Sequence, residues 1–344
     1  MGPANAAIYR CQKVMKPSPI TATVDFETDG IQHGFLRLPY SRDDSAWGSV
    51  MIPMTHAKNG KGPTALLTGA NHGDEYEGPV ALMDLAAALD PALICGRIMI
   101  VPVMNYPAFR NATRTSPIDK GNLNRSFPGR PDGTVTEKIA DYFTRVLLPM
   151  ADIAVDIHAG GRTLDFVPFA CAHRLPDKKQ EKACVAAMKA FNAPCSMMLL
   201  EIDSTGMYDS AVENLGKIFV STELGGGGSS SARSNAIAKR GIRNVLIHAG
   251  ILKGEISRCP TVTLDMPSDD CFTFSEHDGL FEICTDLGEK VSKGAVIAKV
   301  WPPERTGVEP IPYRAKLDGI LAARHFPGLI KTGDCMSVIA VPVG

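Results

Sequence analysis

Apolar and polar positions follow two different spacings between residues 60 and 160. Short unbroken apolar runs occur in TALLTG (64–69), RIMIVPV (97–103) and ADIAVDIH (151–158), which is typical of buried strands. Between them, PVALMDLAAALD (79–90) and TEKIADYFTRVLLPM (136–150) carry apolar residues three and four apart, as amphipathic helices do. We expect the second helix to begin near its first threonine. The alternation of strands and helices predicts an α/β domain.

Three later segments extend this pattern. KKQEKACVAAMKAFNA (178–193) predicts a helix, KIFVSTELGGGG (217–228) predicts a strand that ends in four glycines, and NVLIHAGIL (244–252) is a further short apolar run. Ligands of open α/β sheets bind beyond the ends of the strands. The polar residues most suited to catalysis or metal binding lie at these ends of the predicted strands.

The two ends of the chain differ from the middle. Residues 1–60 contain short apolar runs broken by turn residues, as hairpins do. After CPTVTLDMPSDD (259–270) the helical patterns stop and short strands and turns follow. We therefore expect one domain over residues 1–260, with a β-rich lead-in, and a smaller β-rich domain over residues 261–344.

The smaller domain contains a duplication. DGLFEICTDLGEKVSKGAVIAKV (278–300) and DGILAARHFPGLIKTGDCMSVIA (318–340) share an Asp-Gly start, a glycine ten residues later and an apolar tail. Two such units predict interlocked β half-motifs that resemble the barrel-sandwich fold of biotinyl and lipoyl carriers. The connection at 301–317 lacks the lysine-centred hairpin of those carriers, which favours a structural or oligomerisation role.

Composition narrows the class of function. The 344 residues include 36 basic and 37 acidic side chains, so the chain has no electrostatic footprint for nucleic acid and a small-molecule ligand is expected. It has no apolar run long enough to span a membrane and no secretory signal pattern near the start. Nine scattered cysteines without paired spacing predict reduced, mostly buried thiols and a cytoplasmic location.

The strongest chemical signal is GANHGDEYEG (69–78). His72 and Glu75 are three residues apart, between a predicted strand and a predicted helix, a spacing that brings an imidazole and a carboxylate to one point. Such a pair is common by chance. His158 lies at the end of another strand, where it can supply the third ligand of a catalytic metal site. Asp156, two residues earlier on the same strand, faces the same way and can orient a ligand.

Two further features surround this candidate site. Glu223 precedes the four-glycine loop and can serve as a general base, although isolated loop acids are more often idle. The long turn-rich segment at 113–133 contains Arg114, Asn124, Arg125 and Arg130. Its guanidinium groups can clamp a carboxylate and polarise a carbonyl, and the alternative is a solvated basic loop. The other histidines lack such a context, and His248 is expected to be a core or supporting residue.

Four motifs in order carry a resemblance to a known family. HGDE (72–75), LNRSF (123–127), DIH (156–158) and TELGG (222–226) resemble the succinylglutamate desuccinylase/aspartoacylase family, a branch of the zinc carboxypeptidase-like hydrolases. The resemblance implies a three-layer α/β/α catalytic domain with a mixed sheet and a β-rich C-terminal appendage.

The resemblance also assigns roles. It implies that one Zn²⁺ per chain is bound by His72, Glu75 and His158. It implies that Glu223 takes a proton from the attacking water and passes it to the leaving amine. The remaining roles fall on Arg114, which would stabilise the oxyanion, on Asn124 and Arg125, which would hold the substrate carboxylate, and on Tyr208, which would close over the substrate.

Longer stretches narrow the resemblance. Residues 36–50, 68–82, 114–143 and 222–228 resemble the branch that deacetylates N-alpha-acetyl-L-2,4-diaminobutyrate during ectoine breakdown. The implied partner is a small N-acyl amino acid, and a homo-oligomer is possible. Two alternatives stay open: aspartoacylase or succinylglutamate desuccinylase activity, and a non-catalytic zinc- or ligand-binding protein. A basic substrate side chain would need an acid in the pocket, which the sequence does not place.

Overall fold

A computed structural model describes residues 16–343. Its centre is a large mixed sheet in which the parallel strands β4, β5, β6 and β10 lie side by side and antiparallel strands flank them on both sides. The first part of the sheet is formed by β1 (Thr21–Ala22), β2 (Gly30–Pro39), β3 (Ser49–Asn59), β4 (Thr64–Gly69), β5 (Gly96–Val101), β6 (Ile153–His158) and β10 (Ile218–Glu223).

One face of this sheet is covered by three helices: α1 (Glu77–Ala87), α5 (Lys178–Phe191) and α7 (Ala232–His248). Their buried side chains pack on alternate strand residues such as Leu67 and Val155. Asp177 and Ser231 cap the last two helices by accepting backbone N–H groups in their first turns. The alternation of side chains along each strand sends the intervening residues to the opposite face.

The opposite face carries the second core and, beside it, the candidate site. Its helices are α2 (Tyr106–Arg110), α3 (Val135–Tyr142) with a π-helical continuation at Phe143–Leu147, α4 (Leu148–Met150) and α6 (Tyr208–Asn214), with a 3-10 turn at Leu123–Arg125. Two further 3-10 turns, at Pro91–Leu93 and Asp269–Cys271, contribute no side chain to this core. Thr134 and Glu137 form a capping box that starts α3, close to the predicted position. The expected three-layer α/β/α arrangement is confirmed.

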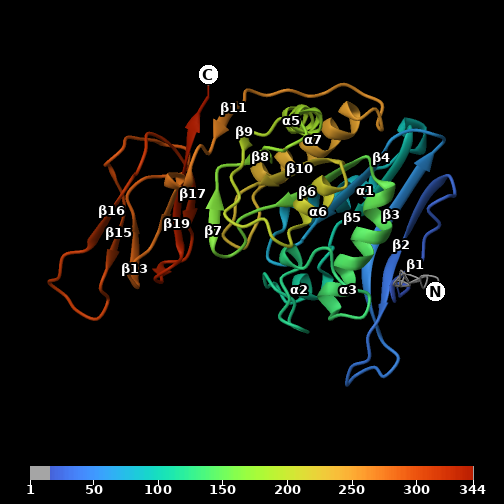
Figure 1. Ribbon diagram of the computed structural model, residues 1–344, viewed down its shortest axis with the longest axis horizontal. Coiled ribbons are helices and arrows are strands. Elements are labelled where there is room, and N and C mark those ends of the chain that lie inside the picture. The colour runs from blue at the N-terminus through green and yellow to red at the C-terminus, as the bar shows by residue number, and fades with distance from the viewer. Residues whose placement is uncertain (1–15, 344) are drawn as a thin grey trace, which may run out of the picture.

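The sheet continues into the C-terminal region. After β10 the strand order runs through β8 (Phe169–Ala172), β9 (Cys195–Met198), β11 (Val262–Asp265), β19 (Cys335–Pro342), β17 (Gly319–His325) and β14 (Lys290–Val291). Two short strands attach to this path, β7 (Leu164–Phe166) on β17 and β12 (Phe272–Phe274) on β19. Figure 1 shows the C-terminal strands as a lobe on one side of the α/β body, with the first strands on the other.

The duplicated units are interlocked. A second sheet contains β13 (Gly279–Ile283), β15 (Val296–Trp301), β16 (Ile311–Arg314) and β18 (Leu329–Ile330). β13 of the first unit pairs with β18 of the second, while β14 of the first pairs with β17 of the second. The opening aspartates act reciprocally: Asp278 accepts from Thr332 N at 2.7 Å, and Asp318 accepts from Lys293 N at 2.8 Å. A small antiparallel C-terminal sheet is therefore present, as expected.

Several local expectations need correction. The apolar run at 244–252 is mostly the last turn of α7, so His248 is an exposed helix end and not a core residue. Its apolar neighbours repeat at helical spacing and pack against the sheet. Of the eight cysteines in the described part of the chain, all are free, but Cys95, Cys259 and Cys284 are exposed. Residues 16–343 contain no helix long and apolar enough to cross a membrane.

Candidate metal and hydrolytic site

The first two site residues lie in the loop between β4 and α1. Ala70 adopts a left-handed conformation with φ of 49°, which turns the chain sharply beyond the strand end and delivers His72 and Glu75 to the same point. His72 Nδ1 lies 2.7 Å from Glu75 Oε1, and both side chains are almost fully buried. Gly73 in the same loop is required, because a Cβ there would lie 2.1 Å from the backbone of Ala108.

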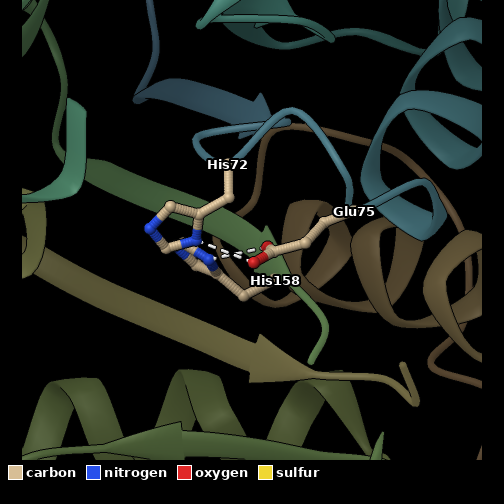
Figure 2. A group of neighbouring side chains, drawn as sticks. All are labelled: His72, Glu75 and His158. Atoms are coloured by element: carbon tan, nitrogen blue, oxygen red, sulfur yellow. Dashed lines mark hydrogen bonds and ion pairs between the residues drawn. The ribbon is translucent and has the colours of Figure 1, made fainter. Parts of the chain in front are cut away.

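The third residue comes from the end of β6. His158 Nδ1 lies 2.9 Å from Glu75 Oε2, and the ring's Nε2 lies 2.7 Å from Asp156 Oδ2 (Figure 2 shows the three converging side chains). Asp156 is fully buried and is held in turn by Thr68 Oγ1 at 2.7 Å and Asn71 Nδ2 at 3.0 Å. The predicted orienting role of Asp156 on His158 agrees with this geometry.

The three side chains have the donor set of a divalent cation site. Their ligand atoms all lie within 4.8 Å of one another, and two imidazoles with one carboxylate suit zinc. Arg114 Nη1 lies 3.3 Å from His72 Nδ1, the same nitrogen that lies 2.7 Å from Glu75 Oε1.

The pKa shifts of the three side chains also favour a bound cation. Burial lowers the pKa of His158, but the carboxylates of Asp156 and Glu75 raise it by more, so its pKa lies well above the ordinary value. Burial dominates at His72 and lowers its pKa. Glu75 keeps a lowered pKa despite burial, since both imidazoles stabilise its charge. The residues present therefore fit a metal ion.

Glu223 lies opposite His158 on the neighbouring strand. The two residues are register partners of the parallel pair β6–β10, so their side chains share a face. Glu223 Oε2 is buried and makes no hydrogen bond within residues 16–343. Burial raises the pKa of Glu223, and the charge of Glu75 acts in the same direction. A carboxyl with a raised pKa beside a metal site suits proton transfer near neutral pH.

The turn-rich segment places three of its four singled-out residues at the site. Arg114 lies 3.8 Å from Glu75, and its side chain is about half exposed, at 48 %. Asn124 Oδ1 accepts from Asn71 Nδ2 at 3.1 Å and from Tyr208 N at 3.2 Å, so its amide group can donate into the cavity that it lines. Arg125 lines the same cavity and is exposed at its mouth.

Two expectations fail on geometry. Arg130 forms a surface pair with Glu137 at 2.9 Å and does not approach the cluster. Tyr208 is fully buried among aromatic rings, with Phe127 at a centroid distance of 4.9 Å and Phe219 at 6.0 Å. It does not line the cavity. The prediction that Tyr208 closes over a substrate is therefore wrong in this structure, because the first turn of α6 directs its ring into the core.

Sequence reasoning missed a second polar group in the same cavity. His173, just beyond β8, lies with Glu201 and Asp209, and their ligand atoms also fall within 4.8 Å of one another. All three line the cavity of about 150 Å³ that contains His72 and Glu223. The alternation Phe169-Cys171-His173 along a short strand could have placed His173 on the site face.

With this geometry in place, comparison identifies the family. The profile of the succinylglutamate desuccinylase/aspartoacylase catalytic domain matches residues 61–249. The chain belongs to this family of amide hydrolases, and it is therefore an enzyme.

Individual relatives agree with that assignment. The chain is 57 % identical to an N-alpha-acetyl-L-2,4-diaminobutyric acid deacetylase from Halomonas elongata over 94 % of this chain and 96 % of the relative. The product-bound ectoine utilization protein EutE (DoeB) from Ruegeria pomeroyi has 69 % identity and a TM-score of 0.94 over 95 % of this chain and 99 % of that one. A succinylglutamate desuccinylase from a Silicibacter species has 68 % identity and a TM-score of 0.93 over 96 % and 100 %.

Proposed function

We propose that this enzyme is a zinc-dependent deacylase that removes the acetyl group from N-alpha-acetyl-L-2,4-diaminobutyrate. The observation that carries the proposal is the shared cavity of His72, Glu75, His158 and Glu223, a three-ligand cation site with a buried carboxyl beside it. The high identity to a relative named as the deacetylase of this substrate supports the choice of substrate. Ectoine utilization is the context named for the Ruegeria protein, and we infer the same context here.

The cation would be held by His72, Glu75 and His158. When bound, Zn²⁺ supplies a Lewis acid that lowers the pKa of water toward about 7. Glu223 accepts the proton of the attacking water through its unpartnered oxygen. The water oxygen forms a bond to the acetyl carbon, the carbon–nitrogen bond breaks, and Glu223 returns the proton to the amine. The products are acetate and a free α-amino group.

Three further side chains would bind and polarise the substrate. Arg114 stands beside the ligand cluster and can stabilise negative charge on the former carbonyl oxygen. The amide of Asn124 and the guanidinium of Arg125 can hold the substrate carboxylate at the mouth of the cavity.

The decisive variant is Glu223→Gln, which keeps the shape of the side chain but removes its basicity. We expect the turnover of N-alpha-acetyl-L-2,4-diaminobutyrate to fall by at least about 100-fold. Zinc content, measured by elemental analysis of the purified protein, should stay at one ion per chain. The matched control is Glu276→Gln, an exposed acid in the C-terminal region. Undiminished turnover in Glu223→Gln would remove Glu223 from its role.

A further inference from the structure

We propose that Glu201 and Asp209 form a subsite that binds a second, cationic amino group on the substrate. This proposal rests on the proposed deacylase function and specifies which acyl amino acids the cavity selects. The residues His173, Glu201 and Asp209 form a group that lines the same cavity as the proposed cation ligands. Within the described chain the group makes no hydrogen bond to any of those ligands.

The order of strands explains how this group reaches the cavity. Across the sheet, β6 is followed by β10, β8 and β9. They carry His158, Glu223 and Cys171 on one face, with His173 just beyond β8. Because Glu223 pairs with Phe169 and Ser221 pairs with Cys171 in this antiparallel pair, His173 lies level with Phe219, displaced along β10 from Glu223. The group of His173, Glu201 and Asp209 and the proposed cation ligands therefore lie at different parts of the one cavity that they line together.

The charges of the group do not balance. Glu213 Oε1 lies 2.9 Å from His173 Nδ1 and neutralises that imidazole, whose pKa is raised to about 10 by neighbouring carboxylates that outweigh the opposing effect of burial. Two carboxylates, Glu201 and Asp209, then remain without a positive partner at hydrogen-bond distance. Glu201 Oε1 is 3.7 Å from His173 Nε2, too far for a hydrogen bond.

The buried polar atoms are also incompletely satisfied. His173 is 8 % exposed and its Nε2 has no hydrogen-bond partner within the described chain. Asp209 is 7 % exposed, and in the described chain its carboxylate accepts only from the adjacent Ser210. Buried carboxylates with free acceptor sites are costly unless a donor arrives. Burial raises the pKa of Asp209, and the charges of Glu201 and Glu213 add to that effect.

A primary ammonium group meets these requirements. It brings one positive charge and three donors, which two carboxylates with free oxygens can accept. The carboxylate of the substrate would remain at Arg125, on the mouth side of the cavity. An acyl amino acid with an acidic side chain would instead place a third negative charge beside Glu201 and Asp209, so the cavity would reject it.

The test uses Asp209→Asn and Glu201→Gln in the full-length zinc-loaded enzyme, assayed on two substrates of equal size. One is N-alpha-acetyl-L-2,4-diaminobutyrate and the other is the neutral N-acetyl-L-homoserine. We expect kcat/KM for the cationic substrate to fall about 10- to 100-fold, chiefly through KM, while kcat/KM for the neutral substrate changes less than about 3-fold. Activity on the neutral substrate also shows that each variant is folded.

The matched control is Asp203→Asn, an exposed acid on the same segment whose only hydrogen-bond partner within residues 16–343 is Thr205. It should leave both substrates unaffected. Equal losses on both substrates, or no loss on either, would overturn the subsite. A second zinc ion per chain that disappears in Asp209→Asn would also overturn it, in favour of a second metal site. If the wild-type enzyme hydrolyses no N-acetyl amino acid, the proposed function itself fails.

Discussion

Asp156 holds His158 by its Nε2 nitrogen at 2.7 Å, which turns the Nδ1 nitrogen of the same ring toward Glu75. One buried carboxylate therefore orients the ring of His158, and in the proposed metal-bound state it would also fix the tautomer. Thr68 and Asn71 hold Asp156 in place from the neighbouring strand and loop.

We expect Asp156→Asn to weaken zinc binding by about 10- to 100-fold, because an amide cannot hold the imidazole in the required tautomer as strongly. Competition with a chelator of known affinity measures the change. The control is Asp152→Asn, which lies before the same strand and accepts from Thr64 N at 2.8 Å, away from the site. Equal affinities for the wild type and Asp156→Asn would contradict the orienting role.

We expect Arg114 to contribute to the rate of the reaction and not to zinc binding. We expect Arg114→Ala to lower kcat by about 100-fold or more through loss of a donor to the developing oxyanion, with zinc content unchanged. Arg130→Ala in the same turn-rich segment is the matched control, since in the described part of the chain that guanidinium pairs only with Glu137, at the surface. Steady-state kinetics of the two variants measures the difference in kcat. Comparable losses in both variants would indicate that the substitutions disrupt the segment as a whole.

His56 predicts a pH dependence of stability. Its side chain is fully buried with neither ring nitrogen hydrogen-bonded in the described chain, and its ring packs edge-on against Phe26 at 5.6 Å. Burial lowers the pKa of His56 to about 4, helped by Arg97 and Lys58. In the unfolded chain this imidazole therefore binds a proton as the pH falls through about 6.5, whereas in the folded chain it stays neutral until the pH approaches 4.

The stability contributed by neutral His56 is therefore present above about pH 6.5 and lost as the pH falls toward 4. Urea unfolding midpoints at pH 7.5 and 5.0 should differ more in the wild type than in His56→Leu. The exposed His248, replaced in the same way, serves as the control and should preserve the wild-type difference. A pH dependence that survives in His56→Leu would place its origin elsewhere.

The glycine loop after Glu223 predicts a steric effect. A Cβ on Gly226 would lie 1.9 Å from the carbonyl oxygen of Leu164, at the start of β7. We expect Gly226→Ala to lower the free energy of unfolding by about 1–3 kcal/mol, as overpacking does, and to reduce activity by moving Glu223. Gly328→Ala is the control, because nothing lies within 4 Å of the added carbon. Thermal unfolding of the two variants tests the contrast.

The sequence predicted for a physical reason that His72, Glu75 and His158 would lie close together, as the structure has them. His72 and Glu75 are close along the chain, and His158 ends an apolar run that could only be a buried strand. Parallel strands bring their carboxyl ends to one edge, so these residues had to meet there. The lead-in was less predictable: residues 24–29 form no strand, since the turn-forming Asp25 side chain accepts from the backbone of Glu27.

Alternation along β8 could have placed His173 on the site face, but the meeting of His173 with Glu201 and Asp209 could not be predicted from the sequence. His173 follows a four-residue strand, Glu201 lies in an irregular segment, and Asp209 is in the first turn of α6. Their meeting depends on the strand order β6-β10-β8-β9, which does not follow the chain and leaves no periodic signal. The misassignment of Tyr208 has the same origin, because the direction in which a short helix points its first residues is decided by packing.

The reciprocal pairing of the two C-terminal repeats has a consequence for how the molecule comes apart. Each repeat lends its short strand to the other, so neither has a complete set of strand partners alone. The pair should melt as one cooperative unit. That unit also supplies β17, the partner of β7, and β7 carries Leu164 and Phe166 along the wall of the cavity. Loss of either repeat would thus release this wall of the cavity, even though the first repeat begins 120 residues after His158 (278 − 158).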